Sequence, residues 1–307
     1  MEEAYLGISK RFESGLEVDL SAGPRELKLG TGMLIANGGS SGFERGALKF
    51  GPRKAWEMSA IARASFTGAT ATAFYIDPNE IPSVDNENEL AGFDWRFDDE
   101  EGGYIGGTFV KVLQSMNAYP QAAPGGIGPP AVTPGAREGL NAVNVYARTN
   151  PYENIFGSSY LGVDGALEWN RDIDMLAWAG RIQASHSWTD VMWVPSITYT
   201  YKTFSGDDPA TSRQERFDPL YYDGSPSTWA TGSKSSMTFI NSNVNAHEVA
   251  LSVNPTKRDK VTLRYAHIRA NELRSPVQFG QATRFEVAGG DNIVAALPIR
   301  IWQTTFF

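Results

Sequence analysis

Strict alternation of apolar and polar residues runs along most of the chain and constrains its fold more than any other feature. In the segment 176–188, Trp178 and Ile182 share one parity while Arg181 and Gln183 share the other, and the segment 191–201 alternates in the same way. A period of two residues is that of a β-strand with two different faces. Roughly 14 such segments are present, so the sequence predicts an all-β fold.

The charges within these segments separate two all-β architectures. In a soluble sandwich the apolar parity faces a shared core, whereas in a transmembrane barrel it faces lipid and the charged parity lines a wet lumen. Several segments span about nine to twelve residues, which suits a tilted membrane crossing better than the shorter strands of soluble sheets. Aromatic residues at segment ends fit the girdles at membrane interfaces. The sequence therefore predicts a transmembrane antiparallel β-barrel.

Connections between the segments alternate in length. Short turns are expected at 13–15, at Thr67-Gly68 and at Thr189-Asp190, and the expected long loops cover about 77–90, 114–139, 205–242 and 271–283. Short turns on one rim and long loops on the other are typical of outer-membrane barrels. No stretch predicts a membrane-spanning helix, since the longest uncharged run is interrupted by several prolines. We expect one barrel domain over residues 1–307.

Composition excludes several classes of function. The net charge of −8 argues against nucleic-acid binding, and the absence of cysteine removes thiolate metal sites and cysteine nucleophiles. Only three histidines are present, and His186 directly follows Ser185, which places their side chains on opposite faces of one strand. We therefore expect no catalytic residues, no cofactor and no metal.

The charged parity supplies candidate residues for the lumen wall. Rings of Arg and Lys select anionic solutes, because fixed positive charge compensates a carboxylate that loses water in a narrow pore. Cross-strand ion pairs that brace the wall are an equally good interpretation, because acidic residues share this parity. The expected pore-lining residues are Arg63, Arg96, Arg148, Arg181, Lys202, Arg264, Asp164 and Glu168.

One sequence block resembles a known family. Ser205-Gly206-Asp207-Asp208 is followed after seven residues by 216–222, which reads Arg-Phe-Asp-Pro-Leu-Tyr-Tyr. This block, with the aromatic segment before it, resembles the alginate export family of outer-membrane β-barrels. The likeness extends from about Ala4 to Gly289, and one departure is Thr31, where the family tends to have arginine after glycine. Its motif loop would comprise Ser205, Gly206, Asp207, Arg216, Phe217, Asp218, Pro219 and Leu220.

The resemblance implies a barrel of about eighteen strands, of which this chain would be a fragment truncated at its N-terminus and perhaps at its C-terminus. It also implies passage of an anionic uronate polymer. We expect the motif loop to fold partly over the lumen, pinned by Phe217 and Leu220, although Asp-Pro sequences are also common turn formers.

The expected function is that of a porin or exporter of the bacterial outer membrane. It would give passive passage to an alginate-like polysaccharide or to smaller acidic sugars. Expected partners are outer-membrane lipid, the acidic solute and periplasmic export components, with no nucleic acid. The alternative is a soluble or secreted all-β carbohydrate-binding protein or hydrolase.

Overall fold

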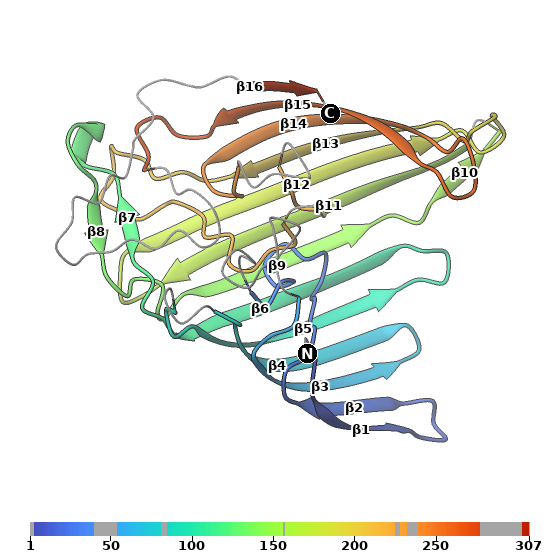
Figure 1. Cartoon of the computed structure of the whole chain (residues 1–307), viewed down its shortest axis with the longest axis horizontal. Coiled ribbons are helices and arrows are strands. Elements are labelled where there is room, and N and C mark those ends of the chain that lie inside the picture. Colours follow the sequence, from blue (N-terminus) through green and yellow to red (C-terminus); the bar gives the residue numbers. More distant parts are fainter. Residues whose placement is uncertain are drawn as a thin grey trace.

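The computed structural model describes residues 3–39, 54–80, 85–155, 157–224, 228–231 and 239–276, together with the backbone of 303–306. A 14-stranded antiparallel sheet dominates the structure (Figure 1), and strands that follow one another in the chain pair almost throughout. There are two exceptions. Strands β7 and β8 form a separate two-stranded sheet, so that β6 pairs with β9. The short strand β10 pairs with the first three residues of β11. Within the described residues, no helix is long and apolar enough to cross a bilayer.

The strands of the first half are β1 (Leu6–Arg11), β2 (Glu17–Ala22), β3 (Met58–Phe66), β4 (Ala69–Asp77), β5 (Glu89–Asp98), β6 (Tyr104–Gln114), β7 (Tyr119–Gln121) and β8 (Ala131–Thr133). The second half contains β9 (Asn141–Arg148), β10 (Tyr152–Asn154), β11 (Gly157–Asn170), β12 (Met175–Ser187), β13 (Ser196–Phe204), β14 (Val244–Val253), β15 (Val261–Ala270) and β16 (Gln303–Phe306).

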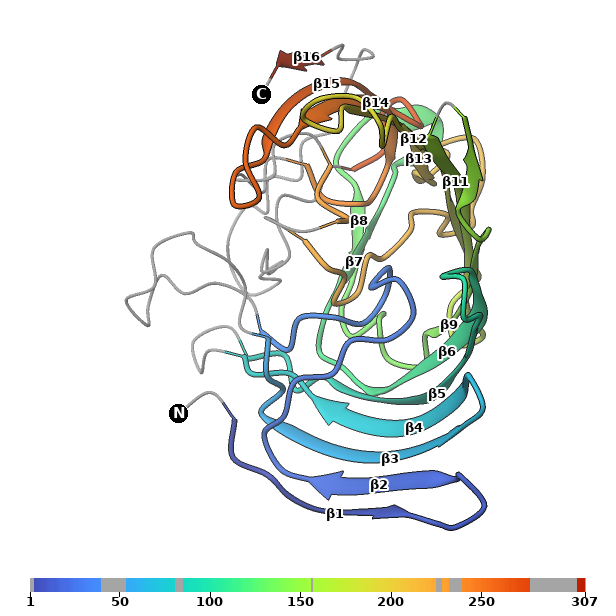
Figure 2. The same cartoon turned by 90° about the vertical axis from the view of Figure 1, so that its right-hand side faces the viewer.

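The two faces of the sheet have the polarity that the alternation predicts. On β11, Val163 and Leu167 are 41% and 50% exposed, whereas Asp164 and Glu168 on the other face are 6% and 0% exposed. A soluble sandwich would bury the apolar residues instead. Figure 2 shows that the sheet is strongly curved and that the described parts of the connections 23–57 and 205–243 lie on its concave side. The inner face is therefore the charged one.

The same inversion continues on the neighbouring strands. Trp178 and Ile182 of β12 and Ile197 of β13 are all exposed on the convex face. Antiparallel strands with an outward apolar band and a polar interior are the architecture of bacterial outer-membrane barrels. The prediction of an all-β membrane wall is confirmed, and these faces place the strands in the outer membrane.

The connections fall into two sets at opposite ends of the strands. At the short-turn end, β1–β2, β3–β4 and β5–β6 are joined by 12–16, by Thr67-Gly68 and by 99–103, and the first two turns lie where they were predicted. At the long-loop end, the connections 23–57, 78–88, 115–140 and 205–243 agree with the predicted long loops to within a few residues, except that 23–57 was not predicted as one. The predicted loop at 271–283 lies mostly outside the described residues.

The prediction of a tight hairpin at Thr189-Asp190 is wrong. Strand β12 continues to Ser187, β13 begins at Ser196, and the connection spans 188–195. The Pro195 carbonyl accepts a bond of 2.9 Å from the Trp188 N–H, and Trp193 adopts a φ of 69°. Because proline has no N–H to donate to a ladder, the strand cannot begin before it. The alternation in 191–195 therefore belongs to a loop.

The apolar core lies inside the curve of the sheet. Three loop segments pack against the inner face and are called the plug: residues 24–38, 205–223 and 228–231. Their fully buried side chains include Ile35 and Trp229, which belong to one cluster with Phe204 of β13 and Ala246 of β14. The plug therefore fills the lumen toward the long-loop end of the strands.

Candidate functional site

The motif loop, residues 205–222, leaves the end of β13 and turns into the lumen. Its first residue stays bonded to β12, because Ser205 N–H donates to the Trp178 carbonyl at 2.9 Å and Ser205 Oγ accepts from the Trp178 N–H at 3.0 Å. The next residue must be small, since a Cβ on Gly206 would lie 2.2 Å from Asn243 Oδ1. The Ser-Gly pair thus lets the chain leave the wall and pass close to β14.

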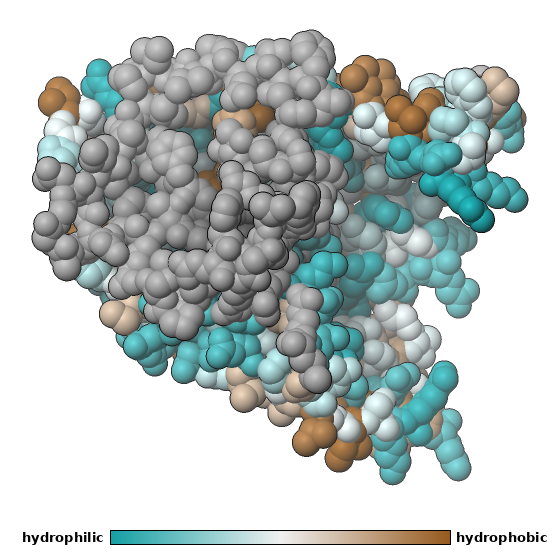
Figure 3. All heavy atoms as spheres, viewed as in Figure 1, coloured by the Kyte–Doolittle hydropathy of each residue, from teal (hydrophilic) through white to brown (hydrophobic). Residues whose placement is uncertain are grey.

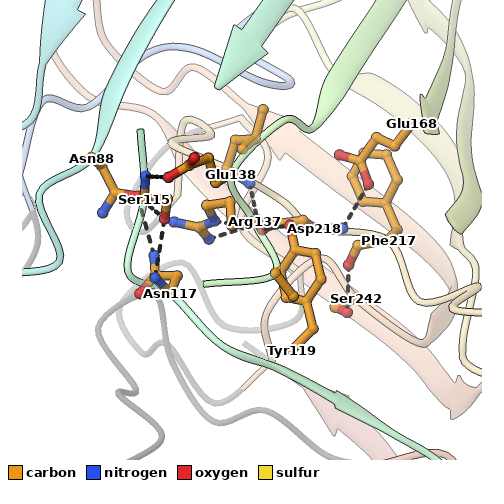
Figure 4. Close-up of polar contacts among 12 residues, drawn as sticks. Asn88, Ser115, Asn117, Tyr119, Arg137, Glu138, Glu168, Phe217, Asp218 and Ser242 are labelled. Carbon is orange, nitrogen blue, oxygen red and sulfur yellow. Dashed lines mark hydrogen bonds and ion pairs between the residues drawn. The ribbon is translucent and has the colours of Figure 1, made fainter. Parts of the chain in front are cut away.

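Asp218 is the centre of an ionic cluster that holds the motif loop (Figure 4). Arg137 donates to its carboxylate from Nε and Nη2 at 2.7 and 2.9 Å, and the Tyr119 hydroxyl donates at 2.6 Å. The Asp218 N–H in turn donates to Glu168 Oε2 on β11 at 2.8 Å. Burial acts to raise the pKa of Asp218, but the Arg137 guanidinium and these hydrogen bonds outweigh it and lower the pKa.

Asp218 also acts as a turn former, and Asp207 connects two parts of the loop that are eight positions apart. Asp218 Oδ1 accepts from the Leu220 N–H at 2.9 Å, and Asp207 Oδ1 accepts from the Glu215 N–H at 2.9 Å. Burial raises the pKa of Asp207. Phe217 and Leu220 are buried within the core, so the loop lies inside the lumen and its apolar residues point into the plug. Ionic and turn-forming roles therefore coexist in one segment.

Four of the expected pore-lining residues lie under the plug. Arg181 pairs with Asp164 at 2.6 Å and stacks on the Trp229 ring at 4.0 Å, and Lys202 Nζ donates to the Ala230 carbonyl at 3.0 Å. With Glu168, all of them are buried, so the expectation that Arg181, Lys202, Asp164 and Glu168 line open space is wrong at these positions. The alternative interpretation, wall-bracing ion pairs, describes Arg181 and Asp164.

The remaining cationic residues of the wall are either in ion pairs or partly exposed. Arg264 and Lys202 both approach Glu248 at 3.4 Å, which adds a second cross-strand ionic group. Arg63 of β3 is half-buried on the inner face and donates from Nε to Thr72 Oγ1 at 3.4 Å. That these residues line a conducting pore stays a prediction.

Arg96 and Arg148 belong to a row of alternating charge and aromatic rings at the short-turn end. The Arg96 guanidinium lies 4.1 Å from the centre of the Tyr104 ring, and Arg148 lies 5.4 Å from Tyr104 and 4.9 Å from Tyr160. These four residues, called the arginine–tyrosine row, come from the adjacent strands β5, β6, β9 and β11. All four are partly exposed on the inner face, outside the region that the plug covers.

Ring stacking fixes the orientation of these guanidinium groups. Arg148 also donates from Nη2 to the Gly102 carbonyl at 2.9 Å, and Arg96 pairs with Asp98 at 2.5 Å. Figure 3 shows hydrophilic residues gathered toward the right of the view, where the short turns lie. A guanidinium held on an aromatic face keeps donors available to an incoming carboxylate. The row can therefore meet both the flat face and the acidic group of a sugar.

The sequence reasoning missed Tyr104 and Tyr160, because it assigned tyrosines as a class to membrane girdles. Parity would have found them: Tyr160 shares its face of β11 with Asp164 and Glu168, and Tyr104 is the direct cross-strand partner of Arg148. Aromatic residues on the charged parity point inward rather than to lipid. Parity, rather than residue type, assigns an aromatic side chain to the lumen or to the girdle.

A serine–histidine contact is present elsewhere on the wall. Ser159 Oγ lies 2.7 Å from His186 Nδ1, and the His186 ring packs edge-on against Trp188 at 4.6 Å. Ser185, on the opposite face as predicted, bonds instead to Thr198 at 2.9 Å. Since His186 lies on the convex face with Trp188, a solute in the lumen would not reach this pair.

Comparison with known proteins adds little to this geometry. No protein-family profile and no curated protein matches the chain. Among solved structures, the outer-membrane expressed OmpT of Vibrio cholerae is similar, with a TM-score of 0.41 and 9% identity over 83% of this chain and 70% of that one. So distant a likeness carries no argument about function, and membership of the alginate export family stays a prediction.

Proposed function

We propose that this chain forms a wall and plug of an outer-membrane barrel that gives passive passage to an anionic polysaccharide or to smaller acidic sugars. The observation that supports the proposal is the arginine–tyrosine row on the uncovered part of the inner face. Transport down a gradient needs no chemistry from the protein, only a wall that lowers the cost of removing water from the solute.

The row fits an acidic sugar better than it fits a small inorganic ion. A pyranose ring is flat and partly apolar, so it packs on Tyr104 and Tyr160, while a carboxylate accepts hydrogen bonds from Arg148. Arg96 contributes less to this contact, because its Nε and Nη2 already donate to Asp98. The spacing across neighbouring strands allows successive sugar units to move from one contact to the next. The plug restricts the same path toward the long-loop end.

The exposed apolar face disfavours the soluble alternative. Trp178, Ile182 and Ile197 are 46%, 49% and 37% exposed on the convex side, where a sugar-binding protein in water would carry polar residues. The arginine–tyrosine row lies on the other face of the sheet, so aromatic residues contact lipid on the convex face and the lumen on the inner face.

Planar-bilayer conductance of the full chain tests the proposal. Wild type should prefer anions to cations and be blocked by a mannuronate oligomer. Arg148→Gln should weaken that block about tenfold, because a hydrogen bond to a charged group is worth about 1.5–3 kcal/mol. Arg148→Lys should recover the anion preference but only part of the block, since an ammonium lacks the planar fork.

Lys257→Gln is the matched control, because Lys257 is exposed in the turn between β14 and β15 and lies outside the row. Its anion preference and its block by mannuronate should equal those of wild type. A preference for cations that Arg148→Gln leaves unchanged would contradict the proposed function.

A further inference from the structure

A polar pocket of about 600 Å³ lies on the plug, separate from the arginine–tyrosine row. Its polar lining consists of Glu26, Lys28, Asn37, Lys54, Asp223 and Thr228. These residues come from three parts of the chain that the fold brings together between β2 and β3 and between β13 and β14. The volume falls within the range of small-molecule sites.

The pocket is built around an ion pair that requires a glycine. Lys28 Nζ lies 2.5 Å from Asp223 Oδ2, and the Asp223 N–H donates to the Gly32 carbonyl at 2.8 Å. Gly32 has a φ of 83°, and a Cβ there would lie 2.8 Å from Lys28 Cε and 2.9 Å from Asp223 Cβ. Only glycine therefore allows the two charged side chains to approach each other at this point.

The ion pair leaves donor capacity on the pocket side. The Asp223 side chain is 11% exposed, whereas that of Lys28 is 48% exposed, so the acid is held in the plug and the ammonium reaches the cavity. An ammonium has three N–H donors, and Asp223 occupies one of them. Asn37 is buried, and it donates from Nδ2 to the Tyr222 carbonyl at 2.8 Å, which fixes its side chain at the wall of the pocket.

The mixture of groups selects the chemistry of the ligand. Lysines 28 and 54 can donate to a carboxylate, while Glu26 and Asp223 can accept from hydroxyl groups and Thr228 can do both. A simple anion would meet two acidic residues here, and a neutral apolar ligand would leave the charges unpaired. A compound with one carboxylate and several hydroxyls satisfies both sets.

We propose that this pocket binds a uronate unit of an acidic oligosaccharide, a site additional to the row. The assignment rests on the proposed function, because it takes the same class of solute. Thr228 precedes Trp229, whose Nε1 donates to the Thr31 carbonyl at 2.9 Å and whose ring covers Arg181. A sugar in the pocket therefore contacts the part of the plug that lies on the wall.

Calorimetric titration of the full chain in detergent with a mannuronate tetrasaccharide tests the pocket. The titration uses the Arg148→Gln background, so that the row contributes little. Adding Lys28→Gln should weaken binding at least tenfold, adding Asp223→Asn should weaken it severalfold, and adding Lys257→Gln should leave it unchanged. A glucose tetrasaccharide should bind far more weakly than the mannuronate.

Two results would contradict uronate binding in this pocket. One is an unchanged affinity for mannuronate in both the Lys28 and Asp223 variants, and the other is an equal affinity for the glucose oligomer. Lys28→Arg, which keeps the charge, should retain binding, so a loss confined to Lys28→Gln reports the charge at this position. Failure of the proposed function would appear elsewhere, as a conductance without anion preference, while the calorimetric difference between these variants persisted.

Discussion

At the scale of single residues, the interior is organised by charges that neutralise one another. Arg137 and Asp218 are 81 positions apart in the sequence, and their bidentate contact holds the motif loop to the loop between β6 and β9. The sequence predicted Asp218 as a motif residue and as a turn former. Its partner could not be predicted, because nothing in the spacing brings Arg137 to it; only the folding of two long loops into one lumen does.

Asp218→Asn tests this contact through its pH dependence. A carboxyl with a lowered pKa stabilises the fold above its ordinary pKa of 3.8, and this contribution is lost as pH falls through the lowered value. At pH 7 the variant should lose about 3–5 kcal/mol, since Arg137 stays buried without its partner. Urea titration followed by near-ultraviolet circular dichroism at pH 7, 5 and 3 measures the difference, which should shrink only at pH 3.

The double variant Arg137→Gln with Asp218→Asn is the control for this experiment. Removing both charges should recover part of the lost stability, because no unpaired ion stays buried. A loss in Asp218→Asn that is the same at all three pH values would show that the carboxylate charge contributes nothing.

At the scale of elements, periodicity identified the strands but not all of their ends. The turn at Thr67-Gly68 was predicted and is present, whereas the strand expected to begin at Val191 begins at Ser196. Parity does not depend on where a strand starts, so the faces of Ile197 and Tyr199 were assigned correctly. Strand ends depend on backbone hydrogen bonds and on prolines such as Pro195, and the alternation of apolar and polar residues does not reveal either.

Thr67→Asn should stabilise the β3–β4 hairpin. Thr67 and Gly68 have φ values of 43° and 78°, a combination that asparagine followed by glycine adopts readily and that a β-branched residue adopts poorly. We expect a gain of about 0.5–1 kcal/mol in a urea titration. Gly68→Ala should lose stability, because its Cβ would lie 2.6 Å from the Asp98 carbonyl oxygen. Equal stability of all three proteins would contradict this account of the turn.

At the scale of the whole molecule, the sequence predicted the sheet, its inverted faces and the two kinds of connection. It predicted that the motif loop folds partly over the lumen, but not that 24–38 and 228–231 join it there, because residues such as Leu34 and Trp229 lie in segments without a clear period. Their burial depends on contacts with distant strands. Of the arginine–tyrosine row, the sequence predicted the two arginines but not the two tyrosines.

Val163→Arg tests the orientation of the wall. Val163 lies near the middle of β11 on the convex face, where an arginine should cost about 2–4 kcal/mol at the membrane midplane. Gln183→Arg on the inner face of β12, where Gln183 pairs with Gly162 next to Val163, is the control matched in depth and should cost little. Folding into lipid vesicles over a urea series measures both. Equal effects of the two substitutions would show that the convex face does not meet lipid.

The plug occupies only one end of the lumen, and this asymmetry has an electrical consequence. Ions entering from the short turns first meet Arg148 beside the Arg96–Asp98 pair, whereas ions entering from the long loops first meet the neutralised pairs of the plug. Conductance should therefore rectify, with the larger current at the voltage polarity that drives anions inward past the guanidinium groups.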